Sequence, residues 1–166
     1  MVPTPPTIIV ANNPIVRKEK PEVNEVVLRD SGVAPEKSGF DFSAEEVVHE
    51  NDKAVDVFFS VSQQGPEFVV GNDADIQDLG QDVSFSRLDN VSSSEWSPTR
   101  RVHGEVGNVY VLWTWDNQYY KFRATSLASS RVAIEWVKMD CGARIAANDD
   151  YRNGRHHRDQ GEKFVR

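Results

Sequence analysis

The fold is decided by residues 108–125, which read NVYVLWTWDNQYYKFRAT. Two runs rich in aromatic and β-branched residues, 108–115 and 118–125, flank the pair Asp116-Asn117. Such runs favour β-strands, and Asp and Asn tolerate the positive φ of a two-residue hairpin turn. The stretch therefore predicts an antiparallel hairpin with residues 116 and 117 as its loop.

A loop of two residues fixes which side chains of the hairpin lie opposite each other. On one side of the sheet it pairs Trp113 with Tyr120, Val111 with Phe122 and Val109 with Ala124. The same alternation returns in Val132, Ile134 and Trp136, so we predict that this side is buried. The opposite side then carries a mixed set: Tyr110, Leu112, Thr114, Tyr119, Lys121, Arg123, Arg131 and Glu135.

Shorter signals complete the expected elements of the domain. Residues 55–61 and 67–70 predict two strands around a turn, and residues 83–85 a third short strand. Residues 86–101, rich in Ser and charge, predict a long exposed loop.

Two segments predict short helices. Residues 43–46, Ser-Ala-Glu-Glu, fit a capping box and favour a helix that ends near residue 50, with a tight turn between strands as the alternative. Residues 73–80 favour one or two helical turns, with Asp73 as the N-cap and Gly80 just past the end.

These elements predict one all-β domain, a small antiparallel β-sandwich or open barrel, over residues 40–140. Residues 1–39 hold six of the eight prolines and predict an extended N-terminal arm. Segments 7–10 and 26–28 of the arm are apolar enough to add to a sheet edge. Residues 141–166 lack periodicity and predict a polar, flexible tail.

Charge and composition limit the function classes. The chain has a formal net charge of −7, and residues 40–140 hold 8 Lys and Arg against 17 Asp and Glu. Nucleic-acid binding depends on clustered Lys and Arg, so we expect no nucleic-acid partner. The lone Cys141 excludes an intrachain disulfide and a Cys-rich zinc site. No apolar run approaches the ~20 residues of a membrane-spanning helix.

The segments 107–111, 114–116, 119–123 and 133–137 together resemble the C-terminal hairpin-and-strand pattern of HmuY-like secreted β-proteins. They read GNVYV, TWD, YYKFR and AIEWV. Members of that group are lipoproteins of the bacterial envelope or exterior, and the best-known ones capture haem. The resemblance implies a β fold and an envelope or extracellular location. Haem iron needs an axial ligand such as His, and none of His49, His103, His156 and His157 maps onto a family ligand.

Recognisable catalytic patterns are missing from the sequence. A Gly-x-Ser-x-Gly elbow and a Cys-His signature are both absent, so we predict that the protein is not an enzyme. Asp73, Asp75 and Asp78 are weak candidates for a cation site, because the calcium-loop template requires Gly and Glu where Asp78 and Ser84 stand. His156 and His157 are adjacent, and adjacent side chains usually point apart. The tail also offers no rigid support around them, so the sequence disfavours a metal site formed by this pair.

The predicted outer face of the hairpin supplies the candidate site. Tyr110, Tyr119, Lys121 and Arg123 would form a ligand or partner surface there, since exposed Tyr and Arg are typical of interaction hot spots. The alternative is an ordinary solvated sheet face. A carbohydrate or apolar-ligand interpretation is suggested by the aromatic set Trp113, Trp115, Trp136, Tyr110 and Tyr119, although alternation places Trp113 and Trp136 in the core.

The leading hypothesis is a non-enzymatic binding or interaction module of the bacterial envelope or exterior, with a protein partner or small ligand and no required cofactor. A structural assembly subunit that uses its N-terminal arm for strand addition is the alternative, and it would be oligomeric. Capture of haem or carbohydrate is a further alternative.

Overall fold

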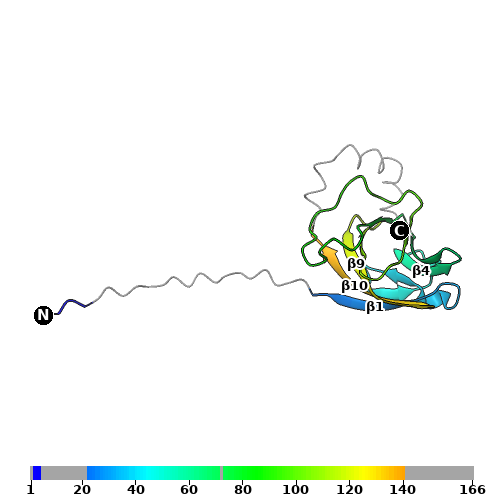
Figure 1. Ribbon diagram of the computed structural model, residues 1–166, viewed down its shortest axis with the longest axis horizontal. Coiled ribbons are helices and arrows are strands. Elements are labelled where there is room, and N and C mark those ends of the chain that lie inside the picture. Colours follow the sequence, from blue (N-terminus) through cyan, green and yellow to red (C-terminus); the bar gives the residue numbers. More distant parts are fainter. Residues whose placement is uncertain (1, 5–21, 72, 141–166) are drawn as a thin grey trace.

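A computed structural model describes residues 2–4, 22–71 and 73–140. Strands between residues 24 and 139 form two antiparallel five-stranded sheets packed as a β-sandwich (Figure 1). Sheet A contains, in spatial order, β1 (Asn24–Arg29), β10 (Arg131–Met139), β9 (Tyr119–Ala128), β8 (Val109–Trp113) and β6 (Asp75–Asp78). Sheet B contains β3 (Glu46–Val48), β2 (Gly39–Asp41), β4 (Val57–Ser62), β5 (Gly65–Val70) and β7 (Arg101–His103). The predicted all-β sandwich is confirmed, and neither sheet closes into a barrel.

The main core lies between the sheets and is rich in aromatic rings. Phe42, which follows β2 of sheet B, lies 4.9 Å from Tyr120 and 5.3 Å from Trp136 of sheet A, measured between ring centroids. The larger side chains of this core are Leu28, Phe40, Phe42, Phe59, Phe68, Ile76, Tyr110, Leu112, Tyr120, Phe122, Ile134 and Trp136. Aromatic contacts across the gap therefore join the two sheets.

The hairpin between β8 and β9 is present, but its predicted register is wrong. Its loop holds three residues, because the Thr114 amide donates to the Gln118 carbonyl at 2.9 Å and the Asn117 amide to the Thr114 carbonyl at 3.0 Å. Asn117 has a φ of 62°, the left-handed residue that such a loop requires. Trp113 consequently lies opposite Tyr119, and Tyr110 lies opposite Phe122.

This shift exchanges the faces of β8. Tyr110 and Leu112 point into the main core, whereas Val109, Val111 and Trp113 lie on the outer face of sheet A. The predicted burial of Trp136, Phe122 and Tyr120 in the core is correct. Trp113 is also buried, but in a different cluster from Trp136.

Three local predictions are corrected by tertiary pairing. Residues 43–50 do not form a helix; a turn leads into β3, as in the alternative that the sequence left open. Residues 73–80 are not helical either, because β6 pairs with β8. Residues 83–85 lie in a bend and turn rather than a strand. Strands at β4 and β5 appear as expected.

The sandwich also begins earlier than predicted. β1 pairs with β10 along its whole length and buries Leu28 completely, so the predicted boundary at residue 39 is too late. The 3-10 helix η1 (Pro35–Lys37) follows β1 and leads into β2. The expected edge-strand segment 26–28 thus belongs to the domain. Segment 7–10 and the tail 141–166 lie outside the described residues.

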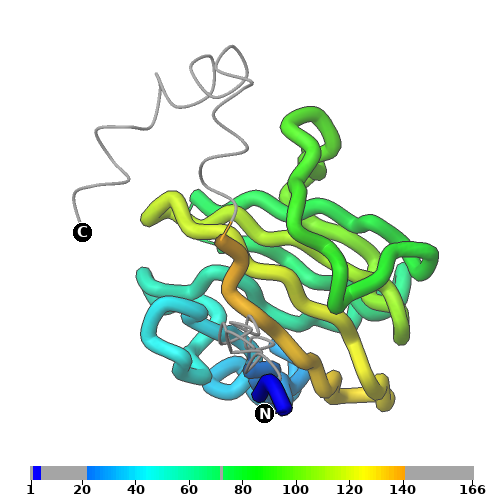
Figure 2. The backbone as a smooth tube through the Cα atoms, turned by 90° about the vertical axis from the view of Figure 1, so that its left-hand side faces the viewer, coloured from blue at the N-terminus to red at the C-terminus, as the bar shows by residue number. Residues whose placement is uncertain are grey.

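A second apolar layer covers the outer face of sheet A. The connection from β6 to β7, the green tube of Figure 2, lies over this face and partly projects from the sandwich. Trp96 of this connection has its ring 5.6 Å from that of Trp113, which stacks on Tyr119 at 5.7 Å. Both faces of β8 are therefore buried, an unusual position for a strand of an antiparallel sheet.

The buried phenols of Tyr110 and Tyr120 predict a loss of stability in alkali. Burial raises the pKa of both groups well above their ordinary value of 10.0. Above pH 10.0 the unfolded chain releases these protons while the folded chain keeps them. The contribution of the two phenols to the free energy of unfolding is therefore fully present below that pH and is lost as the pH rises. The slope is about 1.4 kcal/mol per pH unit for each tyrosine. Urea unfolding should show a shallower decline for Tyr120→Phe than for the wild type; equal slopes would contradict the assignment.

Candidate functional site: a groove on the outer face of sheet A

A groove of about 370 Å³ opens on the outer face of sheet A, beside the loop that follows β6. We call it the outer-face groove. Its lining residues are Val23, Val83, Ser84, Phe85, Ser86, Lys121, Arg123, Glu135 and Val137. The floor comes from β9 and β10, one wall from the loop at residues 83–86, and the opposite wall from Val23, just before β1.

Lys121 fixes the loop wall to the sheet. Its ammonium Nζ donates to the carbonyl of Phe85 at 2.5 Å and to that of Leu88 at 3.1 Å. The Phe85 ring lies 5.1 Å from the ammonium, a cation–π distance. Lys121 is only 5% exposed, and this burial lowers its pKa, while nearby Asp89 opposes the shift. The side chain therefore holds the groove in shape.

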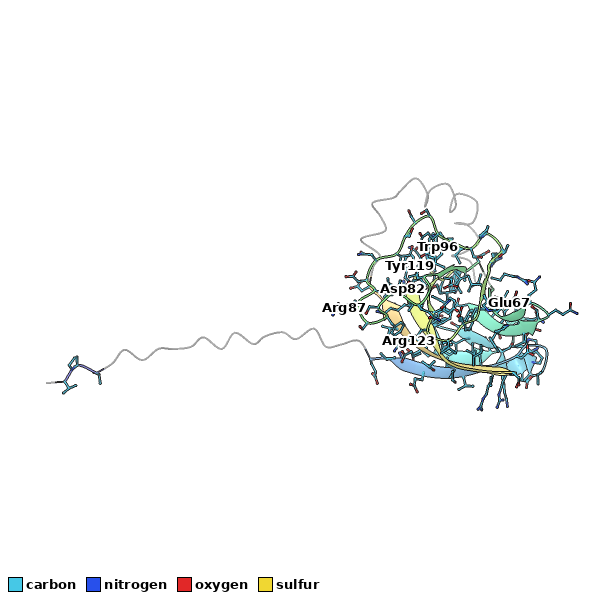
Figure 3. All side chains as sticks on the ribbon, viewed as in Figure 1. Glu67, Asp82, Arg87, Trp96, Tyr119 and Arg123 are labelled. Atoms are coloured by element: carbon cyan, nitrogen blue, oxygen red, sulfur yellow. The ribbon has the colours of Figure 1, made fainter. Side chains whose placement is uncertain are left out.

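Arg123 is the accessible cation of the groove. Its Nε donates to Glu135 on the neighbouring strand, and the guanidinium carbon lies 4.9 Å from the centre of the Phe85 ring. The Arg123 side chain is 43% exposed and that of Glu135 is 13% exposed. Figure 3 labels Arg123 on the same side of the sandwich as Arg87 of the loop, away from Glu67. The carboxylate and the ring hold the guanidinium in place while leaving part of it accessible to solvent.

The predicted partner surface of Tyr110, Tyr119, Lys121 and Arg123 does not form one exposed face. Tyr110 is fully buried in the main core, where its hydroxyl donates to the His103 carbonyl at 2.8 Å and accepts from the Glu105 amide at 2.9 Å. Tyr119 packs in the outer layer beneath Trp96. Of the four, only Lys121 and Arg123 line the groove. The hairpin register turns Tyr110 inward, and Trp96 of the loop covers Tyr119.

The aromatic residues considered for carbohydrate binding are also dispersed. Trp136 is 4% exposed and packs on Phe40 and Phe42 in the main core. Trp113 is 2% exposed and has Trp96 and Tyr119 against its ring. Trp115 lies in the hairpin loop and is half-buried. The three tryptophans therefore do not form one open flat surface on which a sugar could stack.

The aspartates and histidines of the described residues do not form a metal centre. No three His, Cys, Asp or Glu side chains gather into a metal-binding group there, so Asp73, Asp75 and Asp78 are not brought together as one. His49 follows β3 and His103 ends β7, which are the opposite edges of sheet B. These two histidines could not ligate one haem iron together. His156 and His157 lie outside the described residues.

Sequence reasoning missed the contribution of Phe85. It is a single aromatic residue between serines in a polar segment, and it is only 6% exposed because it packs over Val109 and Val137. An isolated apolar residue in such a segment is a signal that the segment lies against the protein. The long loop predicted for residues 86–101 is present, but it is not fully exposed, because Leu88, Val91 and Trp96 pack against sheet A.

Comparisons with known proteins found no matching family model, no matching curated protein and no matching solved structure. In the part of the chain that the structure describes, no helix is long and apolar enough to cross a membrane.

Proposed function

We propose that this protein is a non-enzymatic binding module whose outer-face groove holds a small ligand with an apolar body and one anionic group. The observation that carries the proposal is the position of Arg123. Its guanidinium is partly exposed inside a preformed groove, between the Phe85 ring and the Glu135 carboxylate. Preformed pockets with an apolar lining and few polar groups are typical of small-molecule sites.

The size and lining of the groove support this ligand class. Its volume of about 370 Å³ lies at the small end of the range for ligand sites, which favours one compact apolar group. Val23, Val83, Phe85 and Val137 provide the apolar contacts. The wall residues Ser84 and Ser86, whose hydroxyls lie 3.3 Å apart, add hydrogen-bonding groups at the rim.

The charge of the groove favours an anion. Lys121 and Arg123 are both cationic, and Glu135 is the single acidic side chain in the lining. The whole chain, in contrast, has a formal net charge of −7. Lys121 is buried and donates to two loop carbonyls, so the partly exposed Arg123 guanidinium is the better placed donor for a ligand. Guanidinium groups bind anionic oxygens with directed hydrogen bonds.

The lining also agrees with binding rather than catalysis. Among the groove residues, neither a His nor a Cys accompanies the two serines, which supports binding over a Ser-His or Cys-His mechanism. The resemblance to HmuY-like proteins supports the bacterial envelope or exterior as the place where such a module would act, and this location is part of the proposal.

Anilinonaphthalene sulfonate, an aromatic dye with one sulfonate, is a suitable probe of the groove. We expect the folded protein to bind one dye per chain with saturable fluorescence. Arg123→Gln should weaken this binding about tenfold or more, since hydrogen bonds to charged groups contribute about 1.5–3 kcal/mol. Arg131→Gln, on the exposed start of β10, is the matched control and should leave the affinity unchanged.

Two further results decide the interpretation of this titration. Arg123→Gln leaves Glu135 without its ion-pair partner, and a lone carboxylate would itself repel the dye. The double variant Arg123→Gln/Glu135→Gln removes that repulsion and should still bind weakly. Full recovery in the double variant, or equal affinities for the wild type and Arg123→Gln, would overturn the proposed role of Arg123.

A further inference from the structure

The two edges of sheet A differ in how they are covered. At the β6 edge, the Ser97 amide donates to the Ile76 carbonyl at 2.8 Å, and Gln77 Nε2 donates to the Ser92 carbonyl. The loop between β6 and β7 thus closes that edge. The opposite edge is β1, which lies along the lower margin of the sandwich in Figure 1. The edge strands of sheet B have only three residues each, whereas β1 has six.

The backbone of β1 alternates between β10 and the open side. The Asp30 amide donates to the Ser130 carbonyl at 2.8 Å, and these residues continue the register of the pair. In an antiparallel ladder every second residue makes such bonds, so the even-numbered residues of β1 face β10. Glu25, Val27 and Arg29 therefore direct their N–H and C=O groups outward. No hydrogen bond to these outward groups comes from other described residues.

Side chains at the same three positions are exposed on the outer face. Val27 is 50% exposed, and Glu25 and Arg29 belong to the exposed class. A long edge strand with open hydrogen-bonding groups is a template for another strand, and natural proteins usually block it. In β1 the outward positions read acidic, apolar and basic in order, which is a self-complementary pattern.

A second copy placed antiparallel about a two-fold axis at Val27 satisfies that pattern. Val27 would then face Val27 of the second copy, and Glu25 would face Arg29 of the second copy on both sides of the axis. The odd-numbered residues, whose backbone groups point outward, would pair with each other as the ladder requires. Symmetric self-contact of this kind is the usual geometry of a homodimer.

Within one chain, the same side chains face like charges. Glu25 lies opposite Glu135, which is itself paired with Arg123, and Arg29 lies opposite Arg131. Directly opposed like charges destabilise a sheet. In the dimer, Arg29 of the second copy would lie beside Glu25, and Glu25 of the second copy would lie beside Arg29. Each exposed charge on β1 would then have an opposite charge on the side away from β10. The unfavourable pairs inside the chain thus become part of a balanced row across the two copies.

From these observations we infer that two copies of this chain associate through antiparallel pairing of β1 with β1, joining their five-stranded A sheets into one continuous sheet. This surface lies at the sheet edge and is separate from the binding role of Arg123. Because the contact consists of one short strand from each copy, association is expected at micromolar to millimolar protein concentrations.

Charge reversal at the two exposed positions tests the inference by sedimentation velocity across a concentration series. The wild type should dimerise reversibly. Glu25→Arg and Arg29→Glu each replace two opposite-charge contacts with like-charge contacts, and each should weaken the dimer about tenfold or more. The double variant Glu25→Arg/Arg29→Glu restores the complementarity and should recover dimerisation.

Misfolding cannot explain the expected loss in the single variants. Glu25→Arg meets Glu135 and Arg29→Glu meets Arg131 within the same chain, so neither should lower the melting temperature. Val27→Pro is an independent test, since it removes an outward N–H that β10 does not use. It should abolish the dimer and leave the monomer folded. A wild type that stays monomeric throughout, or a dimer that all these variants retain, would overturn the inference.

Discussion

Phe42→Ala is expected to lower the free energy of unfolding by about 3–5 kcal/mol, the cost of removing a fully buried phenyl ring that leaves a cavity. Phe42 is 1% exposed and follows β2 of sheet B. Its ring lies 4.9 Å from that of Tyr120, 5.3 Å from that of Trp136 and 6.0 Å from that of Phe122, all in sheet A. The variant therefore removes a ring that joins the sheets.

Urea unfolding monitored by tryptophan fluorescence measures this effect. The loss would take a large part of the 5–15 kcal/mol that small domains usually have, so the variant should be close to unfolding at 37 °C. Val47→Ala is the control, because Val47 lies on β3 of the same sheet but is 42% exposed. It should cost below about 1 kcal/mol. Similar losses in the two variants would show that Phe42 does not have this special role.

The fold class was predictable because alternating apolar residues recur in β4, β5, β9 and β10. Each of these strands has at least one face in the core, and period-two burial leaves that pattern in the sequence. The turn residues Gly65-Pro66 and Asp116-Asn117 also indicated where strands end and the next ones begin. An all-β sandwich follows from these two signals without any knowledge of the long-range pairing.

The hairpin register was not predictable from the pattern of β8. Residues 109–113, Val-Tyr-Val-Leu-Trp, are apolar on both faces, so a shift by one residue keeps every position apolar. Alternation selects a register only when one face is polar. Both faces of β8 are buried because a loop covers the outer one. The Asp116-Asn117 pair then favoured a two-residue loop over the three-residue loop that forms.

The sequence pattern is also misleading at β6 and at Lys121, where polar residues are buried. β6 reads Asp-Ile-Gln-Asp, and aspartate is depleted in strands. Its Gln77 is nevertheless fully buried, and the side-chain amide donates to the Ser92 carbonyl. Lys121 alternates with apolar residues, as an exposed lysine on a sheet would. Its burial depends on the loop at residues 83–88, whose position no local pattern encodes.

Three of the nine groove residues, Lys121, Arg123 and Glu135, could therefore be assigned in advance to the outer face of the sheet. Arg123 was correctly assigned to the outer face, and the residue opposite it on β10, Glu135, was expected on the same face. Phe85 and Val23 could not be found, since no sequence pattern shows that the loop at residues 83–86 and the residue before β1 lie beside this face. Long-range contacts of this kind have no periodic signal.

Lys121→Met is expected to detach the loop wall of the groove while the sandwich stays folded. The substitution keeps the apolar stem but removes the ammonium that donates to the Phe85 and Leu88 carbonyls. Bonds to charged groups are worth about 1.5–3 kcal/mol, so the loop should open roughly tenfold to a hundredfold more often. The Leu88 amide, which donates to the Ser84 carbonyl at 3.0 Å, reports that opening through hydrogen exchange.

Removal of the ammonium also relieves a cost. In the folded chain the charge of Lys121 is desolvated, which lowers its pKa, and losing that charge offsets part of the lost hydrogen-bond energy. Global stability should therefore change less than loop protection, and this difference separates a positioning role from a purely structural one. Dye affinity should fall together with loop protection, since Phe85 would no longer cover Arg123. Lys138→Met, at an exposed position of β10, should change neither. If Lys121→Met kept wild-type exchange at Leu88 and wild-type dye affinity, the ammonium would not be what holds the groove open for a ligand.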